Sequence, residues 1–266
     1  MTVDAHHHLW DPAGRDYPWM SSPDLDPIRR VYTVDDLARV VSGTSVLVQT
    51  VSSVEETAEF LAVARGSGGL IAGVVGWVDL EGDLVLPSDD LLVGVRHQLE
   101  DEPDPAWLLR PSVMASLRAL GLPYDLLVRG PQRAAALAGV RELGEVSFVL
   151  DHAGKPEIAA GEWEPWASWI SAMAACPNVV CKLSGLTTQA SWDGWTVEQV
   201  LPYAAHVLAA FGMDRVMFGS DWPVCDLAGG YSGALSVAEA ALVGCGADER
   251  AAVLGGTARR VYGLSG

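Results

Sequence analysis

The most constraining feature of this sequence is its alternation between two kinds of segment. Short runs rich in β-branched residues are separated by longer stretches rich in alanine and leucine. The short runs cover residues 2–5, 45–51, 70–78, 92–97, 123–128, 146–150, 179–183 and 215–218. Apolar runs that alternate with amphipathic stretches are typical of parallel strands joined by helices. The pattern therefore predicts an α/β fold with eight strands.

Six of the longer stretches carry helix signals. They cover residues 53–65, 131–143, 163–175, 196–211, 236–243 and 248–254. The first has Ser53 at the N-cap position and Glu56 three residues later, which is the pattern of a capping box. The second has Pro131 in its first turn, where proline is favoured. The last is expected to stop at Gly255 and Gly256, because glycine favours the end of a helix.

The number of strands and the length of the chain favour one closed domain. Eight strands with helices between them in 266 residues predict a (β/α)8 TIM barrel, with residues 1–266 as a single domain. A doubly wound open sheet is the alternative, but no glycine-rich phosphate-binding motif follows any of the strands. Two long loops, at residues 11–27 and 101–111, are expected to lie at the mouth of the barrel.

The charge of the chain argues against several classes of partner. Seventeen basic and 34 acidic residues give a net charge of −17, which disfavours binding to nucleic acids and to anionic membranes. The four cysteines include no CxxC pair, so free thiols in a reducing compartment are expected. Neither a signal-peptide pattern nor an apolar stretch long enough to span a bilayer is visible. We therefore expect a cytoplasmic protein that acts on a small molecule.

The first strand ends in a run of three histidines. Alternate residues of a strand point to the same side, so His6 and His8 are expected to face the barrel axis while His7 faces the helices. Two imidazoles that converge in this way suit a metal ion or a proton-transfer site. In a TIM barrel the chemistry takes place at the carboxyl ends of the strands, and this is where the two side chains lie.

Ionisable residues also end or follow five later strands. They are Arg96 and His97, Arg129, Asp151 and His152, Lys182, and Asp221. Burying so many polar groups in a barrel core is costly, so an active site explains them better than a set of separate ion pairs. Within the two adjacent pairs, we expect Arg96 and His152 to point inward and His97 and Asp151 to point outward.

The candidate site residues separate into two sets by their chemistry. His6, His8, His152 and Asp221 have the character of metal ligands. Arg96, Arg129 and Lys182 are cations that suit an oxyanion or a carboxylate on the substrate. Two tryptophans in polar loops, Trp10 and Trp222, are expected to line the pocket.

At this point the sequence resembles a known group of enzymes. An HxH motif on the first strand, a later histidine and an aspartate on the last strand resemble the amidohydrolase superfamily. Blocks along the chain resemble its lactonase branch, which includes L-fuconolactonases and 2-pyrone-4,6-dicarboxylate lactonases. These blocks are VDAHHHLWDP, VLVQTVSSVEET, GWVDL, GVRHQLEDEPDPAWL, PYDLLVRGPQ, VLDHAGKP, NVVCKLSGLTT and MFGSDWPV.

The resemblance implies a (β/α)8 barrel that hydrolyses a cyclic ester. It implies that Asp221 is the base that activates water and that His6, His8 and His152 are its partners. The superfamily's second later histidine has no counterpart, and Arg96 stands where a carboxylated lysine is usual. A centre with two metal ions is therefore not expected. One divalent ion, such as Zn²⁺, and no ion at all both remain open, and no organic cofactor is implied.

We therefore expect hydrolysis of a small lactone, namely a sugar (aldono) lactone, by water that Asp221 activates. Two alternatives remain open: a metal-dependent decarboxylase built on the same barrel, and a sugar-acid binding protein without catalysis. A decarboxylase would need a further metal ligand. The sequence leaves the identity of the lactone and the oligomeric state open.

Overall fold

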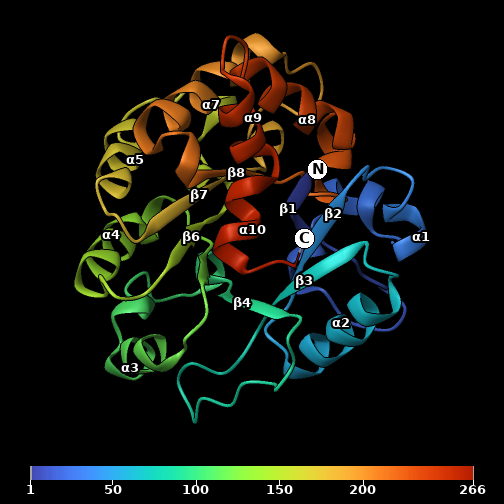
Figure 1. Ribbon diagram of the computed structural model, residues 1–266, viewed down its shortest axis with the longest axis vertical. Helices are drawn as coiled ribbons and strands as arrows, with labels where there is room; N and C mark the ends of the chain where they lie inside the picture. The colour runs from blue at the N-terminus through green and yellow to red at the C-terminus, as the bar shows by residue number, and fades with distance from the viewer. Residues whose placement is uncertain (1, 266) are drawn as a thin grey trace.

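The computed structural model describes residues 2–265 and contains one sheet of eight parallel strands. The strands pair in sequence order and form a ring (Figure 1). Their bounds are β1 Val3–His7, β2 Thr44–Val48, β3 Ile71–Gly76, β4 Leu92–His97, β5 Tyr124–Leu126, β6 Phe148–Leu150, β7 Val179–Leu183 and β8 Val216–Phe218. The eight predicted strands are all present, with some ends trimmed by a few residues. The prediction of a (β/α)8 barrel is confirmed.

The ring is closed between its first and last strands by bonds just beyond the end of β8. His7 and Trp222 form a parallel bridge. The Asp221 amide donates to the carbonyl of His6 at 2.8 Å, and the His8 amide donates to the carbonyl of Trp222 at 2.7 Å. These bonds bring the two histidines of β1 beside the aspartate that follows β8.

Helices surround the ring. Their bounds are α1 Val34–Leu37, α2 Val54–Gly66, α3 Pro111–Ala119, α4 Arg133–Glu142, α5 Trp166–Ala174, α6 Leu186–Gln189, α7 Val197–Phe211, α8 Gly230–Ala241, α9 Ala247–Ala251 and α10 Thr257–Tyr262. As expected, the Ser53 hydroxyl caps α2 by accepting from the Glu56 amide. The Glu56 side chain instead turns to accept from the amides of Thr50 and Val51, so the reciprocal half of the capping box is absent.

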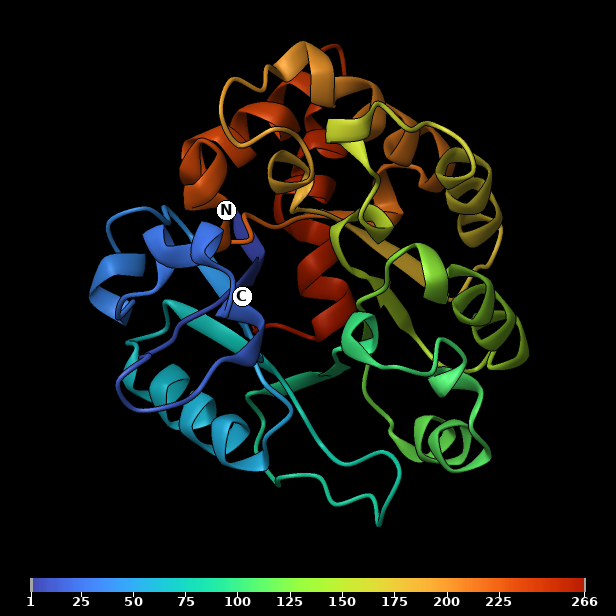
Figure 2. The same cartoon turned by 180° about the vertical axis from the view of Figure 1, so that it is seen from behind.

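Two segments deserve comparison with the sequence prediction. Residues 77–91, between β3 and β4, where no helix was predicted, form an extended loop, seen at the lower edge in Figure 2. The last predicted helix is interrupted at Gly255, whose backbone is non-helical, but the chain does not leave the helical course there: a π-helical turn, Ala252–Gly256, leads into a further helix, α10. The reason is burial, because this segment packs against the outside of β8 and β1 and leads α10 to the barrel.

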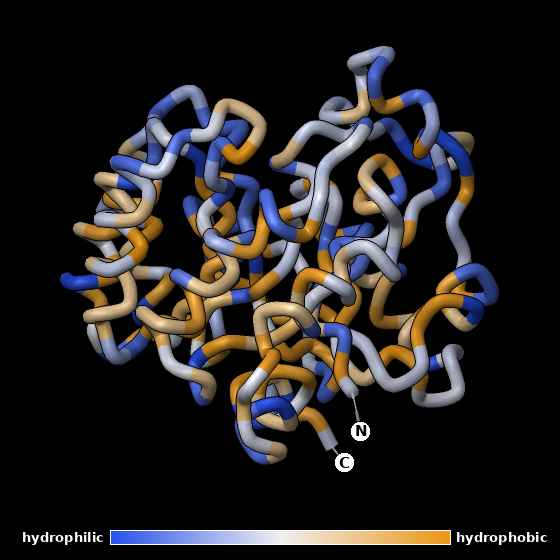
Figure 3. Tube along the Cα trace, turned by 90° about the horizontal axis from the view of Figure 1, so that it is seen from above, coloured by the Kyte–Doolittle hydropathy of each residue, from blue (hydrophilic) through white to orange (hydrophobic). Residues whose placement is uncertain are grey.

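Helix α10 closes the amino end of the barrel. Ala258, Tyr262 and Leu264 are buried among residues from the starts of the strands, such as Val93 and Val180. Figure 1 shows the helix in the centre of the ring, and Figure 3 shows both termini together on one side of the molecule. The opposite end of the barrel remains available for a site.

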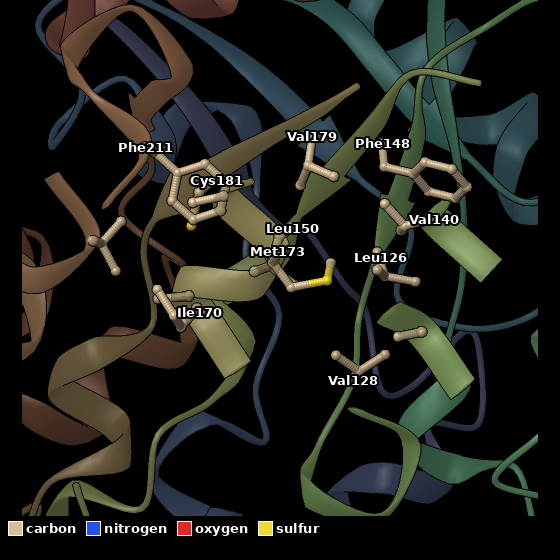
Figure 4. Packing of buried hydrophobic residues seen from close by; sticks show 14 of the residues in the cluster. Leu126, Val128, Val140, Phe148, Leu150, Ile170, Met173, Val179, Cys181 and Phe211 are labelled. Atoms are coloured by element: carbon tan, nitrogen blue, oxygen red, sulfur yellow. The ribbon is translucent and has the colours of Figure 1, made fainter. Parts of the chain in front are cut away.

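The largest part of the hydrophobic core lies between the barrel wall and the helices. Figure 4 shows the region where β5, β6 and β7 meet α4, α5 and α7. Leu150 and Cys181 of the wall are buried with Ile170 and Met173 of α5 and Phe211 of α7. The strands are thus fixed from outside by helix packing, which leaves the carboxyl ends of the strands free to carry polar residues.

Candidate active site

A cavity of about 410 Å³ lies over the carboxyl ends of the strands. Its deep part is polar, its walls include two tryptophans and several aliphatic side chains, and one side is charged. The lining residues are His8, Trp19, Leu25, Thr50, Arg96, Gln98, Glu100, Asp101, Leu127, Arg129, His152, Lys155, Thr188, Gln189, Trp192, Asp221, Val224 and Leu227. Three of the four residues expected to act as catalytic groups, His8, His152 and Asp221, line this cavity.

His6 and His8 point to the same side of β1, with their Nε2 atoms 3.2 Å apart. The Nδ1 atom of His8 lies 2.8 Å from the carbonyl oxygen of Val48. A carbonyl accepts only, so Nδ1 carries the proton and the Nε2 lone pair of His8 faces the cavity. Burial lowers the pKa of His6 well below its usual value. His6 is thus held neutral, and the Nε2 atoms of both rings lie side by side.

Asp221 completes this group from the end of β8. Its Oδ1 atom lies 3.5 Å from Nε2 of His8 and 3.8 Å from Nε2 of His6. Its backbone is left-handed, with φ 60°, an unfavourable conformation that is often retained at functional sites. Burial alone would raise the pKa of Asp221, but the adjacent His152 and His8 lower it below its usual value. The carboxylate is therefore ionised at neutral pH.

These side chains fit a single divalent ion. Ligand atoms around a tetrahedral Zn²⁺ ion, with bonds of about 2.0–2.1 Å, lie roughly 3.3 Å from one another. The three separations among His6, His8 and Asp221 are 3.2, 3.5 and 3.8 Å, and all three residues are buried. Two nitrogens and one carboxylate oxygen are also the ligand types that zinc accepts.

His152 approaches the same point from the turn after β6. Its Nε2 atom is 3.9 Å from Oδ1 of Asp221, and its Nδ1 atom is 2.9 Å from the hydroxyl of Ser184. Burial lowers the pKa of His152 to about 4. A Cβ on Gly185 would lie 2.6 Å from the His152 ring, and Gly185 has φ 63°. Glycine at this position therefore leaves room for the imidazole.

The expected alternation of Asp151 and His152 does not occur. Strand β6 ends at Leu150, and His152 has φ 53°. The chain therefore leaves the pleat before the two residues can point to opposite faces, and both turn inward. Asp151 lies 3.3 Å from Nδ1 of His6 and, with His6 and His152, forms a second group of potential metal ligands.

Beneath the histidines lies a set of fully buried charges, Asp125, Asp151 and Lys182, which we call the floor cluster. The Lys182 ammonium donates to Asp125, lies 3.0 Å from Asp151 and lies 3.1 Å from Nδ1 of His6. Tyr262 of α10 donates to Asp125 at 2.8 Å. Lys182 was expected to contact substrate. It is instead fully buried and does not line the cavity, because the carboxylates beneath the site already bind its charge.

Arg96 of β4 lies between the floor cluster and the cavity. Its Nη1 atom is 3.1 Å from Asp151 and 3.4 Å from Nε2 of His6, and its Nη2 atom donates to the carbonyl of Gln49. Its Nε atom is buried without a partner among the described residues. As expected from alternation, His97 points away from the cavity, where its ring stacks on Trp107 at 4.1 Å.

The two tryptophans that were expected to line the pocket instead pack against other aromatic side chains. Trp10 donates to the carbonyl of Ile28 and packs edge-on against Tyr32, which also packs edge-on against Trp222. Neither Trp10 nor Trp222 lines the cavity, which is walled instead by Trp19 and Trp192. No sequence pattern distinguishes the pocket residues among the ten tryptophans, because the choice depends on how the long loops fold.

Four charged residues from three neighbouring loops form the outer wall of the cavity, and we call them the rim cluster. Glu100 and Asp101 follow β4, Arg129 follows β5 and Lys155 follows β6. Only Arg129 was expected at the site. It lies at the rim with its side chain 49% exposed, and its Nε atom is 2.7 Å from Glu100.

Other residues of the site carried a weak sequence signal. Asp4 and Asp125 interrupt apolar strands, which marks them as buried acids. Asp4 accepts from the amide and hydroxyl of Ser220, the neighbour of Asp221. Burial raises the pKa of Asp4 to about 6. These contacts tie the start of β1 to the turn that carries Asp221.

The architecture and the site define a class: a (β/α)8-barrel enzyme with a histidine–aspartate centre at the carboxyl ends of its strands. The comparisons give the family. The amidohydrolase family model matches residues 3–264, and the chain therefore belongs to this family. Among the described residues, no helix is both long and apolar enough to cross a membrane.

Curated and solved relatives cover nearly the whole chain. An L-fucono-1,5-lactonase of Burkholderia ambifaria is 38% identical over 98% of this chain and 94% of its own length. An L-fucono-1,5-lactonase of Burkholderia multivorans is 37% identical over 99% of this chain and 96% of its own length. A crystal structure of a Burkholderia multivorans amidohydrolase with bound zinc is 36% identical, covers 100% of both chains and has a TM-score of 0.90.

Proposed function

We propose that this protein hydrolyses the ring ester of a small sugar lactone, and that one divalent ion takes part. The observation that carries the proposal is an ionised Asp221 carboxylate within 3.9 Å of the imidazoles of His6, His8 and His152 at the bottom of a cavity of about 410 Å³. The relatives that match 98% and 99% of the chain are L-fucono-1,5-lactonases. A cavity of this size suits a single sugar ring.

In this proposal Asp221 is first the general base and then the general acid. Its carboxylate takes a proton from a water molecule as the water oxygen forms a bond to the lactone carbonyl carbon. The tetrahedral intermediate then breaks the bond to the ring oxygen, and Asp221 returns the proton to that oxygen. The product is an open-chain hydroxy acid. The low pKa of Asp221 keeps the base ionised before each turnover.

The buried histidines and Arg96 would polarise the ester carbonyl and stabilise charge on its oxygen. His6, His8 and Asp221 would hold the divalent ion, which supplies Lewis-acid polarisation of the ester carbonyl when bound. His152, fixed by Ser184, would hydrogen-bond the reacting groups next to Asp221. Arg96 adds positive charge 3.4 Å from His6 and favours the negative charge that develops on the carbonyl oxygen.

A pH-indicator assay with sugar 1,4- and 1,5-lactones tests this function. We expect turnover of at least one of these lactones, loss of turnover after treatment with a chelator, and recovery when zinc is added back. Turnover that survives complete removal of metal would contradict the role of the ion but would leave the proposed lactonase function in place. The absence of turnover on every lactone in the panel would contradict the proposed function itself.

A further inference from the structure

The rim cluster holds two cations that are already neutralised. The Lys155 ammonium lies 2.7 Å and 2.6 Å from the two carboxylate oxygens of Glu100, and Nε of Arg129 lies 2.7 Å from one of them. The side chains of Glu100 and Lys155 are only 13% and 12% exposed. Such charge-assisted bonds are short and directional. Glu100 therefore keeps both cations from pairing with a ligand.

The charge of Glu100 is permanent under physiological conditions. Burial by itself would raise its pKa, but Lys155 and Arg129 lower it to about 2. A second carboxyl group, Asp101, lines the same wall. The two carboxylates of the rim cluster thus balance its two cations, and the wall as a whole carries no formal charge.

The other cation on the cavity wall is also paired. Arg96 contacts Asp151 at 3.1 Å, and Asp221 adds a further negative charge at the bottom of the cavity. Among the described residues that line the cavity, Arg96, Arg129 and Lys155 thus each already have a carboxylate partner. Hydroxyl groups, in contrast, find acceptors in Asp101 and hydrogen-bonding partners in Gln98, Thr188 and Gln189.

We propose that Glu100 is a specificity-determining residue that restricts the site to uncharged, hydroxylated lactones and rejects lactones that carry a carboxylate. This inference rests on the proposed lactonase function and adds the charge class of its substrate. The physical reason is that an anionic substituent at this wall would find both cations of the rim cluster already paired with Glu100 and would approach that carboxylate and Asp101. Like charges repel each other more strongly in a partly buried site than in bulk water.

The test compares two lactones that differ only in charge. One is a hexono-1,4-lactone, and the other is the hexaro-1,4-lactone that has a carboxylate in place of the terminal hydroxymethyl group. The wild type is expected to show the higher kcat/KM on the uncharged lactone. In Glu100→Gln, which keeps the size of the side chain, the preference is expected to fall by roughly tenfold, or about 1.4 kcal/mol. Added salt should reduce this change.

Two further variants control the interpretation. Glu102→Gln removes a carboxylate two residues away that contacts His97 and does not line the cavity, and it should leave the preference unchanged. Arg129→Gln removes a cation of the rim cluster and should strengthen the preference for the uncharged lactone. Because Arg129 is half-exposed, this variant is expected to fold even if Glu100→Gln does not.

The outcomes separate this inference from the proposed function. Equal kcat/KM for both lactones in the wild type, or an unchanged ratio in Glu100→Gln, would overturn the inference while the lactonase stands. If neither lactone is hydrolysed, the proposed function fails. The charge preference is then measured by calorimetric titration with an uncharged hexonolactam and its carboxylate-bearing counterpart, where an equal affinity for both would overturn it.

Discussion

The floor cluster and the rim cluster are both built from acids paired with bases, but they differ in origin and burial. Asp125 and Lys182 of the floor cluster lie on strands and, like Asp151, are fully buried. The rim residues lie on loops after β4, β5 and β6, and the Arg129 side chain is 49% exposed. A rigid, desolvated set of charges beneath the site can orient His6, whereas loop charges at the mouth can select what enters.

The largest effect on activity is expected at Asp221, which belongs to neither cluster. The change Asp221→Asn removes the proposed base and should lower kcat by about 10³-fold with little change in the thermal midpoint. Steady-state kinetics and a thermal melt measure the two effects. Asp226→Asn, five residues further on and hydrogen-bonded to Tyr32, is the matched control. A kcat within tenfold of the wild type would refute the assignment.

The floor cluster should matter most for stability. Lys182→Met leaves Asp125 buried without its cation and Asp151 with Arg96 alone, and breaking a buried ion pair in this way typically costs about 3–5 kcal/mol of unfolding free energy. Urea denaturation measures this loss. Replacing Arg129 by Met at the rim should cost less than about 1 kcal/mol, because exposed ion pairs contribute little. Equal losses in the two variants would erase the distinction between the clusters.

A smaller effect, on the amount of bound zinc, tests the proposed metal ligands directly. His8→Asn removes one of the three atoms that lie 3.2 to 3.8 Å apart, so the variant should retain less zinc after dialysis than the wild type. Elemental analysis measures zinc per chain. His206→Asn, on α7 and away from the cavity, should retain the wild-type amount. If His8→Asn keeps all of its zinc, these residues are not the site of the ion.

The smallest expected effect is a pH dependence at the rim. Glu100 has a pKa of about 2 in the folded protein against an ordinary value of 4.5. As the pH falls from 4.5 towards 2, the unfolded chain takes up a proton that the folded protein does not, so stability falls. Glu100→Gln should therefore lose less stability than the wild type between pH 7 and 3.5. Parallel urea midpoints in the two proteins would contradict this interpretation.

Much of the fold and of the inner site was predictable because both depend on local patterns. Alternating β-branched runs and helical stretches were sufficient to predict the eight strands of the barrel. The period of two along β1 placed His6 and His8 on one face, and the position of Asp221 after the last strand brought it beside them. These residues are fixed by the pleat and by strand order, which a sequence displays directly.

Other features were not predictable because they depend on contacts between distant segments. From the sequence, Lys182 was expected to bind substrate. In the structure its ammonium group donates to Asp125, which also accepts from Tyr262. Asp151 turns inward because the left-handed backbone at His152 ends the strand pattern early. The backbone is non-helical at Gly255, as glycine favours, but the chain resumes as α10 because this segment packs against β8 and β1.

The sequence by itself therefore determined the barrel and the histidine–aspartate centre, because strand periodicity and strand order bring those residues together, and the resemblance of its motifs to the lactonase branch indicated the class of chemistry. Only the tertiary structure decided which charges are already paired and which tryptophans line the cavity. Pairing depends on side chains that meet across loops far apart in the sequence, such as Glu100 with Lys155. The charge that a substrate meets at the cavity wall is a sum over those loops, and it exists only once the chain has folded.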